Sequence, residues 1–375
     1  MHGLSNRIVF TDEQAMLLDA ATAFCRDKAP IASVRAQMTT EHGFDRAVWD
    51  EMVALGWSGI AVPERFGGSG LSLAEAATIA EPMGRRLFAT PFGSTQVFVH
   101  AALAGGSEAQ QAHWLARVAA GAIATTAVLE PEGDWTLAHA QATAVREGGA
   151  LALGGTKTLV CDAAAAELLM ATVSLDGAPA LVVLEHGELP AGALRRDAAI
   201  DETRRAYSLT LDGARVPEDR LISGEHAQAA LRALSDAALL LASAEAAGGI
   251  AGALDVMVDY LNTRTAFGRK IGSYQSLKHT CAEILVGLER SRSHLYHAAT
   301  LLAAGDDAEV ALRMAKVESG ETFAWAGDRA VQFHGGFGFT WDCDAQLFLR
   351  RAMFLQGVYG DGAHHRARLG QLLFG

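Results

Sequence analysis

The sequence predicts an α+β protein in which a small β domain lies between two helical domains. Two observations lead to this fold class. Apolar residues recur with helical spacing up to about residue 122 and again from about residue 226, whereas residues 123–217 form short β-favouring runs separated by turn residues. At 375 residues, the chain also exceeds one typical domain. We therefore expect a helical domain at 1–122, a β domain at 123–217 and a domain of long helices at 218–375.

The helices of the first domain are marked by their ends. Thr11–Gln14, Ser72–Glu75 and Ser107–Gln110 each have the capping-box pattern, in which a serine or threonine precedes a glutamate or glutamine by three residues. The helix that follows Thr11 should stop before Pro30, because proline cannot continue a helix interior. Gly56 should end a later helix, because glycine adopts the left-handed conformation found after helix ends.

Turn residues divide the rest of the chain. In the middle region they form the pairs Gly148-Gly149, Gly154-Gly155, Asp176-Gly177 and Asp212-Gly213. The clearest strands there are Leu181–Leu184 and Tyr207–Val216. The long helical segments that follow are interrupted at Gly305–Asp307 and at Gly335-Gly336. These breaks predict several long antiparallel helices.

Composition excludes some classes of partner. The formal charge is −12 and no run of Lys or Arg occurs, so nucleic acid and anionic membranes are unsuitable partners. The longest apolar run, Ala237–Leu254, contains Ser243 and Glu245 and falls short of about 20 apolar residues, so we expect a buried helix and no membrane span. Within it, Gly248–Gly252 has the G-x-x-x-G spacing that permits close helix packing. Met1–Asp12 has no apolar run, so we expect no signal peptide.

The cysteines and histidines do not indicate a metal site or disulfides. The four cysteines, far apart and without a C-x-x-C, are Cys25, Cys161, Cys281 and Cys343. We expect them to be buried free thiols in a reducing, cytoplasmic compartment. His364-His365 beside Asp361 could ligate a metal, but exposed residues at a helix start are the favoured interpretation, and we expect no metal.

The most informative pattern is a pair of segments, Arg264–Gln275 and Gln332–Phe339. No G-x-G-x-x-G follows a predicted strand, so the usual dinucleotide fingerprint is absent. The two segments instead hold an arginine that can fork onto a pyrophosphate, amides for an adenine edge, an aromatic ring for a flat face and glycines whose N–H groups can approach phosphate. They predict a dinucleotide held without a Rossmann loop. Trp341, shortly after them, could shape the mouth of a pocket, but we expect a buried tryptophan that anchors its loop.

In this order and about 60 residues apart, the two segments resemble the C-terminal domain of the acyl-CoA dehydrogenase family of flavoproteins. Leu55–Leu71, Val128–Pro131 and Val216-Pro217 extend the resemblance over nearly the whole chain. The resemblance implies a middle β-barrel or sandwich, a C-terminal four-helix bundle, an FAD cofactor, an acyl-CoA substrate and an oligomer. It also implies electron-transferring flavoprotein as the electron acceptor and a role in fatty-acid or steroid degradation.

The resemblance also implies where FAD binds. Six residues would grip the FAD of a neighbouring subunit: Arg264, Phe267, Gln275, Gln332, Gly335 and Gly336. Leu129 and Cys161 stand where the family places hydrogen-bonding residues beside the flavin ring. A leucine side chain offers no hydrogen bond and a thiol offers a weak one, so these contacts are lost or weakened.

The family's catalytic base, usually a glutamate, is missing. The family positions for this glutamate fall on Tyr359 or Gly360, and near Ala238, none of which is acidic. The nearby carboxylates are Asp361, Asp236 and Glu245. Asp361 is the candidate base, although its side chain is one methylene shorter than that of glutamate. The alternative is that Asp361 bonds its own backbone in the Gly-Asp-Gly turn.

Three functions therefore stay open. The first is FAD-dependent α,β-dehydrogenation of an acyl-CoA thioester, either in a homo-oligomeric dimer or tetramer or as one subunit of a two-gene α2β2 enzyme like those that act on bulky steroid side-chain esters. The second is a catalytically deficient partner that completes a neighbour's FAD site. The third is a flavin monooxygenase or nitroalkane-type oxidase on the same fold. The sequence does not identify the acyl group.

Overall fold

The computed structural model describes residues 11–375, which divide into two compact units. One unit comprises the chain up to Ser33, Leu73–Phe88 and Leu239–Gly375, and the other comprises Val34–Ser72 and Ala89–Ala238. Helices precede and follow a β region, which confirms the α+β fold class. The domain boundaries at 122 and 217 stay predictions, and most of the segment searched for a signal peptide lies outside the described residues.

Between residue 11 and the first strand, six α-helices occur. They are α1 (Asp12–Lys28), α2 (Ile31–Gln37), α3 (Arg46–Ala54), α4 (Leu73–Arg85), α5 (Phe92–Gly105) and α6 (Glu108–Ala119). Thr11 and Ser107 form the predicted capping boxes of α1 and α6. Helix α1 stops before Pro30, and Gly56, with φ +78°, follows α3, both as predicted.

The β region consists of two sheets. Its strands are β1 (Ala124–Ala127), β2 (Thr143–Glu147), β3 (Ala150–Gly154), β4 (Thr156–Cys161), β5 (Leu168–Leu175), β6 (Ala178–Glu185), β7 (Leu194–Arg196), β8 (Ala206–Thr210), β9 (Arg215–Pro217) and β10 (Leu221–Ile222). One sheet has the order β10-β6-β5-β2-β3-β9, with β1 parallel to β5, and the other has the order β4-β8-β7. Leu181–Leu184 lies in β6 as predicted. The strand predicted at Tyr207–Val216 is divided between β8 and β9, because the chain turns at Gly213 with φ +85°.

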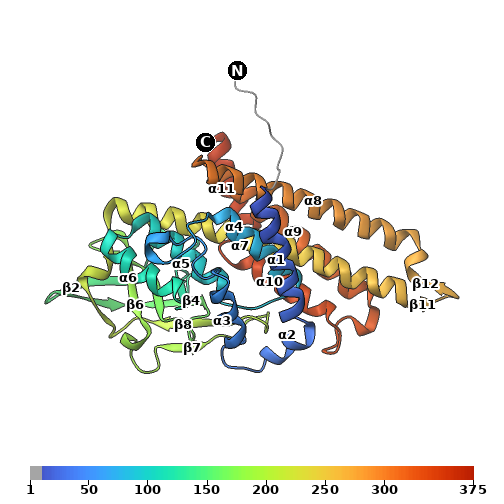
Figure 1. The fold of residues 1–375 in the computed structure, drawn as a ribbon, viewed down its shortest axis with the longest axis horizontal. Helices are drawn as coiled ribbons and strands as arrows, with labels where there is room; N and C mark the ends of the chain where they lie inside the picture. The colour runs from blue at the N-terminus through green and yellow to red at the C-terminus, as the bar shows by residue number, and fades with distance from the viewer. Residues whose placement is uncertain (1–10) are drawn as a thin grey trace, which may run out of the picture. The chain divides into compact units, whose positions relative to one another are not determined.

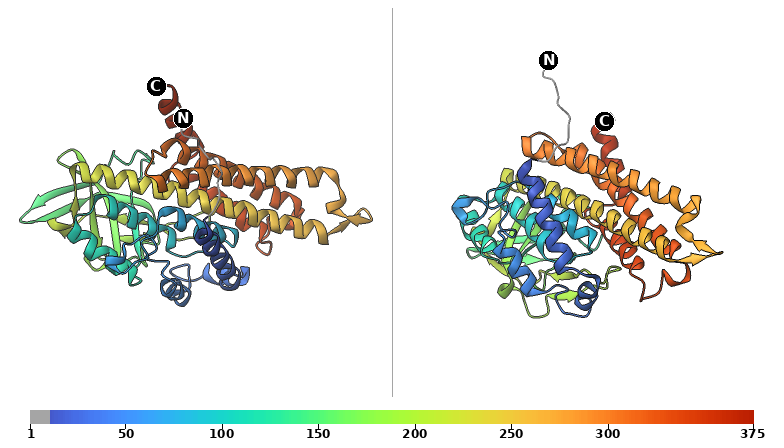
Figure 2. Two further views of the ribbon diagram at one scale, coloured as in Figure 1. Left: turned by 45° about the horizontal axis from the view of Figure 1, so that its top comes forward. Right: turned by 45° about the vertical axis from the view of Figure 1, so that its right-hand side comes forward.

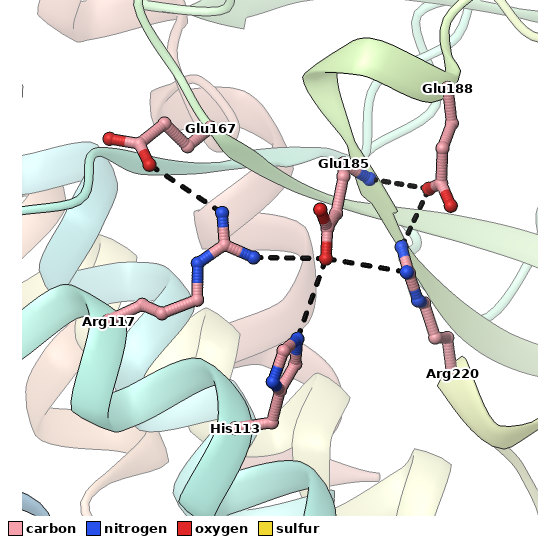
Figure 3. Close-up of polar contacts among 6 residues, drawn as sticks. All are labelled: His113, Arg117, Glu167, Glu185, Glu188 and Arg220. Atoms are coloured by element: carbon pink, nitrogen blue, oxygen red, sulfur yellow. Dashed lines mark hydrogen bonds and ion pairs between the residues drawn. The ribbon is translucent and has the colours of Figure 1, made fainter.

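A cluster of ion pairs ties α6 to the end of β6 (Figure 3). One carboxylate oxygen of Glu185 lies 3.0 Å from Arg117, 3.3 Å from Arg220 and 3.5 Å from His113. Arg220 also pairs with Glu188 at 2.7 Å. Burial opposes the charge on Glu185, but the two arginines hold its pKa below the ordinary value. The cluster thereby fixes a helix of the first helical region on the β region.

Long helices build the C-terminal bundle (Figure 1). They are α7 (Gly224–Thr263), α8 (Gln275–Ala304), α9 (Glu309–Phe333), α10 (Ala345–Gly357) and α11 (Gly362–Phe374). The breaks after α8 and α9 fall where glycines predict them. Within residues 11–375, α7 is the one helix long and apolar enough to cross a membrane, but 89% of its most apolar window is buried, which confirms the buried helix at Ala237–Leu254.

Glycines let α4 and α7 touch backbone to backbone. A Cβ atom on Gly248 would lie 1.8 Å from the carbonyl oxygen of Glu81, and one on Gly84 would lie 1.9 Å from that of Glu245. A Cβ on Gly252 would lie 2.3 Å from the carbonyl oxygen of Arg85. The close packing expected from the G-x-x-x-G spacing is therefore confirmed.

None of the four cysteines, all of which lie among the described residues, forms a disulfide bond. Cys25 and Cys343 are buried as expected, whereas Cys161 and Cys281 are half-buried. Within the described part of the chain, no three His, Cys, Asp or Glu side chains gather as a metal site would require.

Candidate functional site

Helices α7 and α9 bring the two segments predicted to bind a dinucleotide to the same end of the bundle. Tyr260, in the last turn of α7, stacks on His334, the residue that follows α9, with ring centroids 4.1 Å apart. Arg264 lies one turn beyond Tyr260, and Gln332 lies in the last turn of α9. The two segments, distant in sequence, therefore meet at one surface.

The same surface carries a short hairpin, β11 (Thr265–Ala266) and β12 (Arg269–Lys270), at the far end of the long helices in both views of Figure 2. Phe267 at its tip is 95% exposed. Beyond α9, Phe339 and Trp341 are 74% and 52% exposed. The expectation that Trp341 is buried is wrong, because its ring lies beside the Arg350 guanidinium instead of in the core.

The six residues predicted to grip FAD are all exposed. They are Arg264, Phe267, Gln275, Gln332, Gly335 and Gly336. A Cβ atom on Gly335 or Gly336 would meet nothing within 4 Å, so a ligand can approach this backbone closely. An exposed diglycine backbone, an exposed guanidinium and two amides suit the adenine and pyrophosphate end of FAD.

The β region brings together the two segments expected beside the flavin ring. The backbone N–H of Thr158 donates to the carbonyl oxygen of Leu129 at 2.8 Å, and the Thr125 hydroxyl donates to the carbonyl oxygen of Cys161 at 2.6 Å. Strand β4 bulges between these contacts, where Leu159 has φ +53°. The two segments are thus positioned through their backbones, and their side chains do not restore the donors lost at Leu129 and Cys161.

A buried ion pair beneath these segments was not predicted. Lys157 Nζ lies 2.6 Å from Glu130 Oε1 and donates to the Thr172 hydroxyl at 2.8 Å. Glu130 also accepts the N–H groups of Gln141 and Ala142. Against the effect of burial, Lys157 and these N–H groups hold the pKa of Glu130 below its ordinary value. The pair joins β4 to the Glu130-Pro131 turn, but no motif spacing links its two residues in the sequence.

Asp361 lies at the start of α11 and acts as its N-cap. Its carboxylate accepts the backbone N–H of His364 at 2.8 Å, and this hydrogen bond lowers the pKa of the exposed Asp361. A proton-abstracting base instead needs a dry pocket that raises its pKa towards the working pH. The geometry therefore favours the backbone-bonding interpretation of this residue over the catalytic one.

The turn before Asp361 leaves no room for a glutamate at Gly360. Gly360 has φ +100°, and a Cβ atom there would lie 2.7 Å from the His364 ring and 3.0 Å from that of His365. His365 is 1% exposed and His364 is half-buried, so the expectation that both histidines are exposed is wrong. Burial of His365 and the positive charge of Lys316 lower its pKa to about 3, which leaves the ring neutral.

Lys316, on α9, holds this turn through hydrogen bonds to its backbone. No sequence motif predicted this role. Lys316 is 4% exposed, and burial lowers its pKa to about 8. Its ammonium donates to the backbone carbonyls of Leu355 at 2.7 Å, Gln356 at 3.3 Å and Gly360 at 3.2 Å. A cation at these carbonyls closes the C-terminal end of α10.

The second family position for the catalytic base also lacks a suitable carboxylate. Ala238 is 1% exposed and carries no acid. Glu245 on α7 lies 2.5 Å from the fully buried guanidinium of Arg351. Asp236 is half-buried on the same helix. A carboxylate held by a buried arginine is stabilised as the anion, which weakens it as a base.

Comparisons with known proteins agree with the motifs. Models of the acyl-CoA dehydrogenase N-terminal and C-terminal domains match residues 11–122 and 227–373. Acyl-CoA dehydrogenase IpdE2 of Mycolicibacterium smegmatis is 28% identical over 91% of this chain and 93% of its own length. A variant of the Tcur3481-Tcur3483 steroid ACAD is 27% identical, with a TM-score of 0.88 over 96% of this chain and 98% of its own. Butyryl-CoA dehydrogenase from Megasphaera elsdenii shares the fold. Its TM-score is 0.89 and its identity 21%, over 98% of this chain and 99% of its own.

Proposed function

Because the chain belongs to the acyl-CoA dehydrogenase family, we propose that it is one subunit of an FAD-dependent enzyme that dehydrogenates an acyl-CoA thioester. The observation that carries this proposal is the exposed end of the bundle, where an arginine, two amides and an open diglycine backbone meet. These groups suit a dinucleotide and lie outward, where a neighbouring subunit can present one.

Each residue at this end has a physical role in holding the dinucleotide. Arg264 would fork onto the pyrophosphate, and the exposed backbone at Gly335 and Gly336 would offer N–H groups to its oxygens. Gln275 and Gln332 would hydrogen-bond the adenine end, and Phe267 would cover it from the hairpin. The bound FAD would supply the acceptor for the hydride that leaves the β carbon of the substrate, and electron-transferring flavoprotein would reoxidise it, by family analogy.

The proton from the α carbon needs a base that this chain does not supply at either family position. Asp361 caps α11, Gly360 has no space for a longer side chain, and Ala238 is apolar. We therefore infer that a second, glutamate-bearing subunit provides the base in an α2β2 assembly. The similarity to a steroid ACAD named by the pair Tcur3481-Tcur3483 supports both this assembly and a bulky acyl group as substrate.

The test compares turnover of the lone chain with that of the chain co-expressed with a second family member that carries a glutamate at either position. We expect the co-expressed pair, and not the lone chain, to reduce a one-electron acceptor dye, and we expect Asp361→Asn to leave this activity unchanged. Losing a general base typically lowers the rate by about 10²–10⁴-fold, so the lone chain should be nearly inactive. Robust turnover of the lone chain that Asp361→Asn abolishes would make Asp361 the base. Rapid reoxidation by air would instead indicate an oxidase or monooxygenase.

A further inference from the structure

Three buried polar atoms on or beside α5 have no hydrogen-bond partner among residues 11–375. They are Ser58 Oγ, Gln96 Oε1 and His100 Nε2. Ser58 and Gln96 are fully buried, and His100 is partly exposed although its Nε2 atom is not. A buried polar atom without a partner is costly, and folded proteins rarely leave three such atoms near one another.

The residues that carry the three atoms are neighbours. Gln96 and His100 lie one turn apart on the same face of α5. The Gln96 amide nitrogen donates to the carbonyl oxygens of Ser58 at 2.8 Å and Trp57 at 3.4 Å, which places the amide against the Ser58 backbone. Because those two neighbours are carbonyls, Nε2 is the donor and Oε1 is the atom left over.

Other buried polar side chains of α5 do form hydrogen bonds. The Ser94 hydroxyl donates to Asp162 at 2.7 Å, and the Thr95 hydroxyl donates to the carbonyl oxygen of Ala124 at 3.1 Å. The helix therefore does not leave its polar side chains unpaired as a rule. The unpaired atoms of Gln96 and His100 are a local feature that calls for an outside group.

The chemistry of the three atoms selects that group. Gln96 Oε1 can only accept a hydrogen bond, the Ser58 hydroxyl can donate or accept, and His100 Nε2 can do either according to its tautomer. Burial lowers the pKa of His100 to about 4, so its ring is neutral at neutral pH. A charged ligand finds no counter-charge here, and a ketone oxygen would leave the glutamine oxygen unpaired. A hydroxyl group, which both donates and accepts, satisfies the set.

We propose that Ser58, Gln96 and His100 form a subsite that binds a hydroxyl group on the acyl part of the CoA ester. This inference rests on the proposed acyl-CoA function. The apolar side chains of the same helix favour the acyl part over the charged nucleotide of CoA. Phe92 and Val99, both buried, lie one turn from Gln96 on its face of the helix. A buried water has the same hydrogen-bonding chemistry as a hydroxyl, and the experiment separates the two.

The experiment measures, by calorimetry on the full-length protein in its assembled state, the affinity for octanoyl-CoA and for octanoyl-CoA esters hydroxylated at successive carbons towards the chain end. We expect one hydroxylated ester to bind at least about ten-fold more tightly than octanoyl-CoA, because its hydroxyl group forms hydrogen bonds with atoms that octanoyl-CoA leaves without a partner. Equal affinities would overturn the subsite alone. Failure of every ester to bind would overturn the acyl-CoA function with it.

Two variants and a control separate a ligand subsite from a bound water. Ser58→Ala and His100→Leu should each remove most of the preference for the hydroxylated ester without lowering the Tm of the ligand-free protein, because the atoms they delete have no protein partner. Thr95→Val, which deletes a hydroxyl already bonded to Ala124, should lower the Tm and leave the preference intact. If Ser58→Ala lowers the Tm and weakens both esters equally, the group bound there is a structural water and the proposal is wrong.

Discussion

At position 360 the backbone conformation decides which residue the turn accepts. With φ +100° and two histidine rings beside the missing Cβ, glycine is the residue that fits without movement of His364 or His365. A sequence comparison alone left the family's glutamate position ambiguous between Tyr359 and Gly360. The structure explains the absence of the acid at Gly360 as a local requirement of this turn.

Asp361 should behave as a helix cap. Asp361→Ala should lower the free energy of unfolding by about 1 kcal/mol, because the His364 N–H loses its acceptor, whereas Asp361→Asn keeps an acceptor and should change it little. Since the pKa of Asp361 is lowered in the folded state, its contribution should persist at neutral pH and disappear as the pH falls through that folded-state pKa. Urea denaturation checks both variants. A loss of turnover in Asp361→Asn without any loss of stability would contradict the cap role.

Single residues also show where sequence reasoning fails. The capping boxes at Thr11 and Ser107 could be predicted, because each involves residues three apart in the chain. Trp341 and His365 could not be placed correctly, because burial depends on which distant element packs against a residue. Lys316 and the Glu130–Lys157 pair were missed for the same reason.

At the scale of elements, the α4–α7 contact depends on glycine. Gly248→Ala should destabilise the protein by about 1–3 kcal/mol or more, because its Cβ would lie inside the contact distance of the Glu81 carbonyl and the two helices would have to separate. Gly370→Ala on α11 is the matched control, since a Cβ there meets nothing within 4 Å, and it should be neutral or stabilising by up to about 1 kcal/mol. Chemical denaturation of both variants tests this. Equal stability of the two would show that the helices do not touch at Gly248.

Lys316 should make the stability of the α10–α11 turn depend on pH. Its folded-state pKa of about 8 lies below the unfolded value of about 10.4, so between these values the unfolded chain binds the extra proton. The free energy of unfolding due to Lys316 should then rise with pH over this window. The Tm difference between wild type and Lys316→Met should therefore grow from about pH 8 to about pH 10.5. Lys278→Met, at an exposed lysine of α8, controls for the lost charge, and a flat difference would refute the assignment.

Long elements were easier to predict than short ones. The long C-terminal helices carry enough turns for helical spacing and glycine breaks to mark them. Strands β7 and β9 have three residues each, and their pairing with β8 and β3 comes from the sheet and leaves no periodic signal. The fold class followed from local patterns, whereas strand order required the structure.

For the whole molecule, the bundle end matters because the six residues predicted to bind a dinucleotide are exposed there. Their role stays a prediction, and the structure shows only that their two segments meet through Tyr260 and His334. Which subunit presents the FAD is a property of the assembly. The central claim is that this chain completes the FAD site of a neighbour.

The most direct measurement of that claim is size-exclusion chromatography with light scattering and flavin absorbance on the chain together with its glutamate-bearing partner. We predict that FAD elutes with an oligomer. Arg264→Ala, introduced into this chain and not into its partner, should weaken FAD retention by the oligomer about ten-fold or more, because a charge-assisted hydrogen bond contributes about 1.5–3 kcal/mol. Arg290→Ala, at an exposed arginine of α8 paired with Glu318, should leave FAD retention unchanged. A stable monomer of this chain with a full complement of FAD, indifferent to Arg264→Ala, would contradict the claim.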